Sequence, residues 1–172
     1  MSKRAWFLLC VLATTASCGK GAPPPPPTAG DVFSRAMNAL GAGDLAALGS
    51  VLSPAGADQV RRDLEAWRTA VLVDPAEGPR VLSRLPSGPA APPRALVEKA
   101  LAGDPAALLA LYVAIDPHPA SGESDPSAAA AYGVPVVPGS PVLFLYAARD
   151  GSRRRVILTK YPDGWKVDLL SL

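Results

Sequence analysis

The sequence contains few of the residues from which catalytic and metal sites are commonly built. Two cysteines and one histidine occur among its 172 residues. It has no paired-cysteine metal motif, no Gly-rich phosphate loop, no Gly-x-Ser-x-Gly pentapeptide and no internal repeat. These absences remove the common catalytic constellations, and we expect neither a metal ion nor a cofactor.

An excess of charge is also missing once the N-terminal segment is set aside. The whole chain has a formal charge of +2. Removing Lys3 and Arg4 from 17 basic residues leaves 15, which equals the 15 Asp and Glu residues. A domain without net charge has no general electrostatic attraction to polyanions. We therefore expect no nucleic-acid partner.

The apolar run at the N-terminus is too short to span a membrane. Residues 5–13 (AWFLLCVLA) rise about 1.5 Å each in a helix, whereas a hydrocarbon core is about 30 Å thick. Lys3 and Arg4 precede the run and small residues follow it. A basic start, an apolar core and a small-residue cleavage region are the three parts of a secretory signal. We expect residues 1–17 to be a removable signal peptide.

The segment Thr15-Ala16-Ser17-Cys18 resembles the bacterial lipobox, although the lipobox prefers Leu where this chain has Thr15. The resemblance implies cleavage before Cys18, a diacylglyceryl group on its thiol and acylation of its new amino group. Two or three acyl chains give durable membrane anchoring. Gly19 in place of Asp favours the outer membrane of a two-membrane cell by the same resemblance. The alternative is a secreted protein cut near Ala16.

Residues 18–29 are expected to tether the domain to this anchor. Prolines 23–27 favour a polyproline II rod that extends about 3.1 Å per residue. A proline run is also a ligand for proline-recognising domains, but a spacer is favoured directly after an anchor. Cys10 is removed with the signal peptide and Cys18 is acylated, so no disulfide is expected in the domain.

Helical periodicity predicts that the single domain, residues 30–172, begins with short helices. Gly41 and Gly43 end the first helix, Asp44 caps the second, and Ser53-Pro54 begins the third. Their expected apolar positions are Val32, Phe33, Ala36, Met37 and Leu40, then Leu45, Leu48, Val51 and Leu52, then Val60, Leu64, Trp67 and Val71.

Three further helical segments are expected between residues 74 and 115. A short turn runs from Asp74-Pro75 to residue 85, and two helices follow over residues 95–102 and 105–115. The last helix is apolar almost all round, which predicts that it is buried. In the preceding third helix, Arg61 and Glu65 are expected to pair on the outer side.

Near the C-terminus the spacing of apolar residues changes from the helical period to alternation with a period of two. This alternation predicts three antiparallel strands, over residues 142–148, 153–161 and 165–170. Pro162-Asp163-Gly164 suits a three-residue turn. Its register places six side chains on one face as the pairs Tyr161–Trp165, Thr159–Val167 and Ile157–Leu169. The sequence therefore predicts an α+β fold, with N-terminal helices packed on a C-terminal antiparallel meander of at least three strands.

Three motifs accompany this order of elements, namely Phe33-x-x-Ala36, Gly43-Asp44-x-x-Ala47-Leu48 and Asp163-Gly164-Trp165-Lys166-Val167-Asp168. Together with the order of elements, they resemble the nuclear-transport-factor-2-like (cystatin-like α+β) superfamily. The resemblance implies a curved sheet that forms a cone with a pocket. Residues 74–141 depart from it, because they read as helices and proline-rich loops where strands are expected. The superfamily includes enzymes, binding modules and scaffolds, so it selects no function.

The candidate reactive residues lie together in one proline-flanked loop. Asp116, His118, Glu123 and Asp125 are candidates for a metal site or an acid–base pair. A single imidazole in such a loop lacks the rigid supporting groups that this chemistry requires. A solvated loop is the favoured interpretation, and we expect no catalytic residue.

Two other groups have a functional interpretation beside a structural one. In Arg153-Arg154-Arg155, strand alternation sends Arg154 to one face and its neighbours to the other, which favours a solvated strand end over an anion-binding patch. Tyr112, Tyr132 and Tyr146 are candidates for lining a pocket, although aromatic residues near a sheet more often belong to the core.

These observations favour a non-enzymatic, membrane-anchored lipoprotein of the cell envelope. Its domain is expected to bind a small apolar ligand or a protein partner. The alternatives are a structural or assembly factor of the envelope and, third, an enzyme of the same fold. The sequence leaves the oligomeric state open.

The lipid anchor can be tested by replacing Cys18. Because only the Cys18 thiol is expected to carry the diacylglyceryl group, Cys18→Ala should move the protein from the membrane fraction to the soluble fraction of the cell envelope. Cys10→Ala is the matched control and should leave the protein in the membrane fraction. A Cys18→Ala protein that still fractionates with membranes would contradict the anchor.

Overall fold

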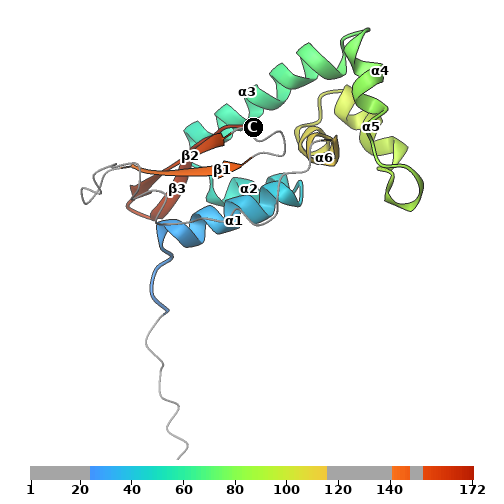
Figure 1. Ribbon diagram of the computed structural model, residues 1–172. Coiled ribbons are helices and arrows are strands. Elements are labelled where there is room, and N and C mark those ends of the chain that lie inside the picture. The colour runs from blue at the N-terminus through green and yellow to red at the C-terminus, as the bar shows by residue number, and fades with distance from the viewer. Residues whose placement is uncertain (1–23, 116–140, 148–152) are drawn as a thin grey trace, which may run out of the picture.

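The computed structural model describes residues 24–115, 141–147 and 153–172, and it has helices followed by strands (Figure 1). This arrangement confirms the predicted α+β fold. The helices are α1 (Ala29–Gly41), α2 (Leu45–Val51), α3 (Pro54–Trp67), the π-helical turn η1 (Arg68–Leu72), α4 (Glu77–Leu82), the 3₁₀ turn η2 (Gly88–Ala90), α5 (Arg94–Leu101) and α6 (Pro105–Ile115). The strands are β1 (Val142–Ala147), β2 (Arg153–Tyr161) and β3 (Gly164–Leu170).

The first three helices begin where the sequence places capping side chains. Thr28 and Asp31 form a capping box at the start of α1. Asp44 Oδ1 accepts a hydrogen bond of 2.9 Å from the Ala47 amide at the start of α2. Ser53 Oγ accepts one of 3.1 Å from the Gly56 amide in α3. These bonds satisfy amide groups that have no partner within a helix, and they fix where each helix starts.

The apolar face predicted for α1 is buried as expected, and Phe33 on that face reaches the sheet. The ring of Phe33 stacks on Phe144 of β1, with 4.6 Å between the ring centroids and an angle of 11° between the planes. Both rings are in the same hydrophobic core cluster. Since aromatic rings bury large areas, this stack joins the N-terminal helix to the C-terminal strands.

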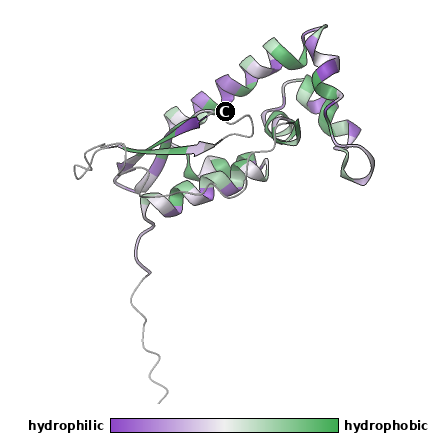
Figure 2. Cartoon of the chain, viewed as in Figure 1, coloured by the Kyte–Doolittle hydropathy of each residue, from purple (hydrophilic) through white to green (hydrophobic). Residues whose placement is uncertain are grey.

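Helix α6 is surrounded by other elements, as its apolar sequence predicts. It contacts α1, α2, α3 and α5. Figure 2 shows it as hydrophobic almost throughout, whereas α3 has hydrophilic and hydrophobic stripes. The buried residues of α6 are Ala107, Leu108, Leu109, Leu111, Tyr112 and Val113. A helix without a polar face is stable in water only when its neighbours cover it.

The three strands form one antiparallel sheet in the order β1-β2-β3. In Figure 1 the sheet lies between α1 and α3, and β3 contacts both helices. Leu52 extends the β3 side through an isolated parallel bridge to Val167. The Ser53 amide donates a hydrogen bond of 2.9 Å to the Val167 carbonyl. The residues before α3 are thereby fixed to the sheet.

The register predicted for the last hairpin is partly wrong. Tyr161 pairs with Gly164, so the turn has two residues instead of the three expected. Thr159 therefore pairs with Lys166, and Val167 pairs with Leu158. The predicted pair Ile157–Leu169 is present, because a bulge shifts the register between these pairs and leaves Asp168 as the additional residue of β3.

The bulge decides which residues of β3 enter the core. Val167 and Leu170 are fully buried, whereas Leu169 is half-buried. The predicted alternation of Trp165, Val167 and Leu169 on one face therefore fails after Val167. An extra residue in one strand reverses the side-chain alternation that follows it, and a turn-based register cannot anticipate this.

The ion pair predicted between Arg61 and Glu65 is also replaced by other pairs. Arg61 Nη1 lies 3.1 Å from Asp58 Oδ1, and Arg68 Nη2 lies 2.7 Å from Glu65 Oε1. Both observed pairs join residues three apart. Spacings of three and four are both neighbours on a helix, so the competing acidic and basic residues decide which pairs form.

The contact between α3 and β3 leaves no room for a side chain at Gly56. A Cβ atom at this position would overlap the carbonyl oxygen of Val167. Gly56→Ala should therefore force α3 away from β3 and lower the free energy of unfolding by about 1–3 kcal/mol. Gly49→Ala is the matched control, because a Cβ there meets nothing within 4 Å.

Urea denaturation of both variants provides the measurement. Since alanine favours a helix over glycine, Gly49→Ala should be neutral or more stable by up to about 1 kcal/mol. Equal stability of Gly56→Ala and the unchanged chain would show that α3 does not pack as closely on β3 as the structure indicates.

Candidate functional site

The candidate site is a pocket of about 530 Å³ at the end of α3. Its walls come from α3, η1, α4 and the residues just after it, α6, the start of β2 and the C-terminal residue. This volume falls in the range of about 300–1,000 Å³ that is typical of pockets for small molecules. The pocket brings together segments from both the helical part and the sheet.

Two aromatic side chains form part of the apolar wall. Trp67 of α3 and Tyr112 of α6 meet edge to face, with 5.3 Å between their centroids and 87° between the ring planes. Leu64, Val71, Val81, Ile115 and Leu172 complete the apolar lining. Seven of the ten lining residues are therefore apolar or aromatic. Trp67, which the sequence assigns only to the core, is half-buried and exposed to this pocket.

Three charged side chains also line the pocket, namely Asp63, Arg84 and Arg154. Arg154 Nη1 donates a hydrogen bond of 3.0 Å to the hydroxyl oxygen of Tyr112. Asp63 Oδ1 accepts a bond of 2.7 Å from Gln59 Nε2. Arg84 lies just after α4 and is exposed. A pocket that combines apolar side chains with a few polar groups is the usual form of a small-molecule site.

Arg154 reaches the pocket because of its position in β2. Arg154 alternates with Val156 and Leu158, which are fully buried, so all three point to the core side of the sheet. Arg153 and Arg155 are exposed on the other side. The predicted separation of the three arginines is thus confirmed, but Arg154 is half-buried beside Tyr112 and is not at a solvated strand end.

A π-helical turn forms the part of the wall that follows α3. At the end of η1, the amide of Val73 donates to the carbonyl of Arg68, five residues back, at 2.9 Å. Trp67 precedes this wide turn and Val71 lies within it, and both side chains line the pocket. Single π-helical turns are rare in proteins, and those that occur are often found at functional sites.

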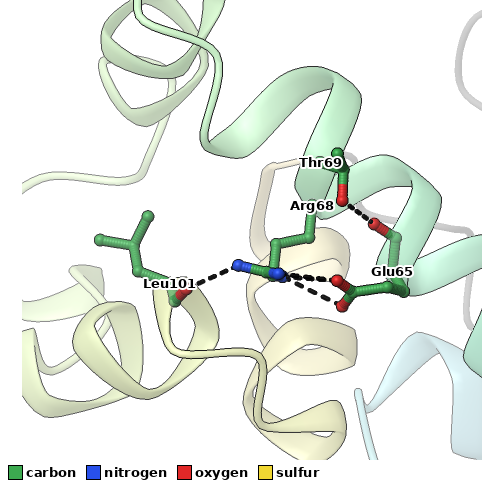
Figure 3. A network of polar contacts seen from close by, with 4 residues as sticks. All are labelled: Glu65, Arg68, Thr69 and Leu101. Carbon is green, nitrogen blue, oxygen red and sulfur yellow. Dashed lines mark hydrogen bonds and ion pairs between the residues drawn. The ribbon is translucent and has the colours of Figure 1, made fainter.

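Arg68 connects this turn to α5, as Figure 3 shows. Its guanidinium donates to both carboxylate oxygens of Glu65, and Nη1 donates at 3.0 Å to the carbonyl of Leu101. The hydrogen bonds from Arg68 hold the pKa of the Glu65 carboxyl below its usual value. Thr69 Oγ1 donates to the Glu65 carbonyl at 2.9 Å. These bonds fix the end of α3 and cap the last turn of α5.

Helix α4 contributes Val81 to the pocket, and its position depends on Gly78. A Cβ on Gly78 would lie 2.5 Å from the carbonyl oxygen of Leu72 in η1. Only a residue without a side chain permits this approach of the two backbones. The same close packing also places Arg84, which follows α4, at the pocket.

A second polar cluster lies at the junction of α3 and the sheet. Tyr161 Oη donates a hydrogen bond of 2.8 Å to Asp168 Oδ1. Burial raises the pKa of the Asp168 carboxyl, but bonds from Ser53, Thr159 and Tyr161 outweigh it, and the pKa is lowered overall. Since each of these hydroxyl groups has a partner, we assign the cluster a structural role at the bulge of β3.

The other predicted site residues divide into two sets. Tyr112 lines the pocket, as one interpretation of the sequence proposed, and Tyr146 is buried and donates to the Ser171 carbonyl at 2.6 Å. The remaining candidates, Asp116, His118, Glu123, Asp125 and Tyr132, lie outside the described residues, as do Cys18 and the tether up to residue 23.

The part of the chain that the structure describes contains no cluster of residues suited to binding a metal ion. No three His, Cys, Asp or Glu side chains lie close enough there to hold a metal ion. Within the same residues, no helix has the length and apolar character needed to cross a membrane.

The hydrogen bond between Tyr161 and Asp168 predicts a measurable change in the pKa of Tyr161. Donation of a hydrogen bond to Asp168 raises the pKa of the Tyr161 phenol above its ordinary value. This bond stabilises the folded state at pH values below the unfolded pKa, and the stabilisation is lost as the pH rises through the folded pKa. Asp168→Asn should therefore lower the pH at which Tyr161 ionises, measured by carbon NMR of labelled tyrosine.

Asp163→Asn is the matched control for this titration. It removes the same charge from the same hairpin, but Asp163 contributes only the weakest of the influences on the pKa of Tyr161. We expect a much smaller shift for Asp163→Asn. Equal shifts in the two variants would show that general charge, and not the Tyr161–Asp168 hydrogen bond, sets the pKa.

No protein-family model, no curated protein and no solved structure matches the chain. The residues of the pocket and the sequence features of the N-terminus are therefore the features that bear on function.

Proposed function

We propose that this chain is an exported, lipid-anchored protein of the cell envelope whose domain binds a small ligand without chemical conversion. The observation that carries the proposal is the pocket of about 530 Å³, in which seven of the ten lining residues are apolar or aromatic. Burial of apolar ligand surface against such a wall is favourable by about 25 cal/mol per Å² before the costs of binding are subtracted.

The chemistry of the lining supports binding over catalysis. The described lining contains no Ser, Cys, Lys or His side chain. Its carboxylate, Asp63, is hydrogen-bonded to Gln59, and its two guanidinium groups have no acceptor with which to act as a general base. A nucleophile with an adjacent general base is therefore missing from these residues, whereas groups that orient a ligand are present.

The proposed location follows from the N-terminal features. Acylated Cys18 would hold the protein on a membrane, the outer one in a cell that has two, and the proline-rich tether would separate the domain from the lipid. The nuclear-transport-factor-2-like resemblance belongs to the same proposal, since helices packed on an antiparallel meander are compatible with it.

Residues 24–172 are sufficient for a binding experiment, because every core residue of the described structure lies between Val32 and Leu170. Native mass spectrometry of this segment, purified from its host, should show a bound small molecule. Fluorescence titration with phenylnaphthylamine, a neutral apolar dye, should show binding at one site.

A variant in which a larger side chain fills the pocket is compared with a variant that carries the same side chain outside it. Val71→Trp adds bulk to a lining residue and should abolish dye binding. Val73→Trp places the same side chain two residues away, at a position that is 49% exposed and outside the lining, and should leave binding unchanged. If the unchanged domain binds neither dye nor copurified ligand, the proposed function is wrong.

A further inference from the structure

We infer that the ligand of this pocket is a small zwitterion with an apolar body, whose ammonium group binds Asp63 and whose carboxylate binds Arg84. This inference rests on the proposed binding function and adds the chemical class of the ligand. It is carried by two opposite charges that line the pocket and form no ion pair with each other, and by the indole ring that lies beside Asp63 on α3.

The helical period places Asp63 beside the aromatic part of the wall. Asp63 and Trp67 are four residues apart on α3, and both line the pocket. Residues with this spacing lie one above the other on the same face of a helix. A cation bound by the Asp63 carboxylate therefore lies within one helical turn of the Trp67 indole, and the face of an aromatic ring attracts positive charge. Val71 and Ile115 extend the apolar wall for the body of the ligand.

The carboxylate of Asp63 is oriented by its neighbours on α3 and has room for a further donor. Gln59 Nε2 donates to Asp63 Oδ1 at 2.7 Å, and Arg62 Nη2 donates to Gln59 Oε1 at 2.9 Å. Among the described residues, Asp63 forms no ion pair, and its Oδ2 accepts no hydrogen bond. Since a carboxylate has about four acceptor positions, Asp63 can accept the hydrogen bonds of an ammonium group.

Arg84 reaches the pocket from a different element. It follows α4, three residues after Val81, which also lines the pocket, and its amide donates to the Val81 carbonyl at 3.0 Å. Its guanidinium is exposed and has no hydrogen bond or ion pair with a described residue. The planar fork of N–H donors in a guanidinium matches the two oxygen atoms of a carboxylate.

A ligand with both charges gives each of these two groups a partner. A ligand with only one charge would cover the other protein group without pairing it, which lowers affinity. Opposite charges also attract more strongly in a pocket from which water is partly excluded than in bulk water. Arg154, the remaining charged residue of the lining, is bonded to Tyr112, and we assign it no contact with the ligand.

Four indole compounds separate this inference from the proposed function. Tryptophan and the dipeptide tryptophylglycine carry both charges, tryptamine carries only the ammonium group, and indole-3-propionate carries only the carboxylate. Each is titrated at neutral pH against residues 24–172 with phenylnaphthylamine bound. Because the second charged contact adds to the affinity, at least one zwitterion should displace the dye at a concentration about fivefold lower than either singly charged compound. Binding of the neutral dye without this preference would overturn the inference and leave the proposed function intact.

Variants assign the two charged contacts to their residues. Asp63→Asn keeps an oxygen atom for the bond from Gln59, and it should weaken the zwitterions and tryptamine about fivefold without affecting indole-3-propionate. Arg84→Gln should weaken the zwitterions and indole-3-propionate by a similar factor without affecting tryptamine.

Asp58→Asn and Arg80→Gln are the matched controls. They remove the same charges from exposed positions of α3 and α4 that are outside the lining, and they should leave all four displacement curves unchanged. Equal losses in Asp63→Asn and Asp58→Asn, or in Arg84→Gln and Arg80→Gln, would reduce the effect to general charge and contradict the inference.

The two zwitterions also distinguish the source of the ligand. One added residue extends the separation of the ammonium group and the carboxylate by up to about 3.6 Å. Displacement at the lower concentration by tryptophan assigns a free amino acid, and displacement at the lower concentration by tryptophylglycine assigns a short peptide. If neither displaces the dye more readily than tryptamine and indole-3-propionate do, the ligand is not a zwitterion.

Discussion

The fold depends on the need to cover α6 on every side. Its six buried residues have no polar face among them, so the helix is stable only when α1, α2, α3 and α5 surround it. Each fully buried leucine of α6 contributes about 1.5–3 kcal/mol of transfer free energy. Because α6 ends beside α3 and β2, the same requirement brings Tyr112 to Trp67 and to Arg154. The pocket thus lies at the C-terminal end of α6, where Tyr112 and Ile115 contribute to its lining.

A second constraint, the junction of α3 with β3, determines the direction of α3. Ser53 binds the sheet through its amide and caps α3 through its hydroxyl group, and Gly56 permits the backbones to touch. The wide turn η1 and the Arg68 bonds then fix the far end of the helix to α5. With both ends held, residues near the end of α3 form one wall of the pocket. Preorganisation of this kind favours ligand binding, because little conformational entropy is lost.

Local signals in the sequence predicted much of this structure, and longer-range pairings explain where prediction failed. The caps at Asp44 and Ser53 and the apolar face of α1 depend on residues a few positions apart, and they were found correctly. The register of β2 and β3 was partly wrong, because a bulge at Asp168 depends on contacts with Ser53, far away in the sequence. Of the residues that line the pocket, the sequence identified Tyr112 as a candidate. It also contained a signal for Arg154, because this residue alternates with Val156 and Leu158 and must therefore point to the core side of the sheet.

The sequence by itself determined the kinds of elements, their order, the burial of α6 and the expectation of an anchor at Cys18, since these depend on composition and on short-range periodicity. Only the tertiary structure decided that Asp63, Arg84 and Arg154 line the same pocket as Trp67. These residues lie on separate elements, and their approach depends on how α3, α4 and β2 pack around the core. No local pattern encodes such an approach, because it results from the simultaneous burial of many side chains.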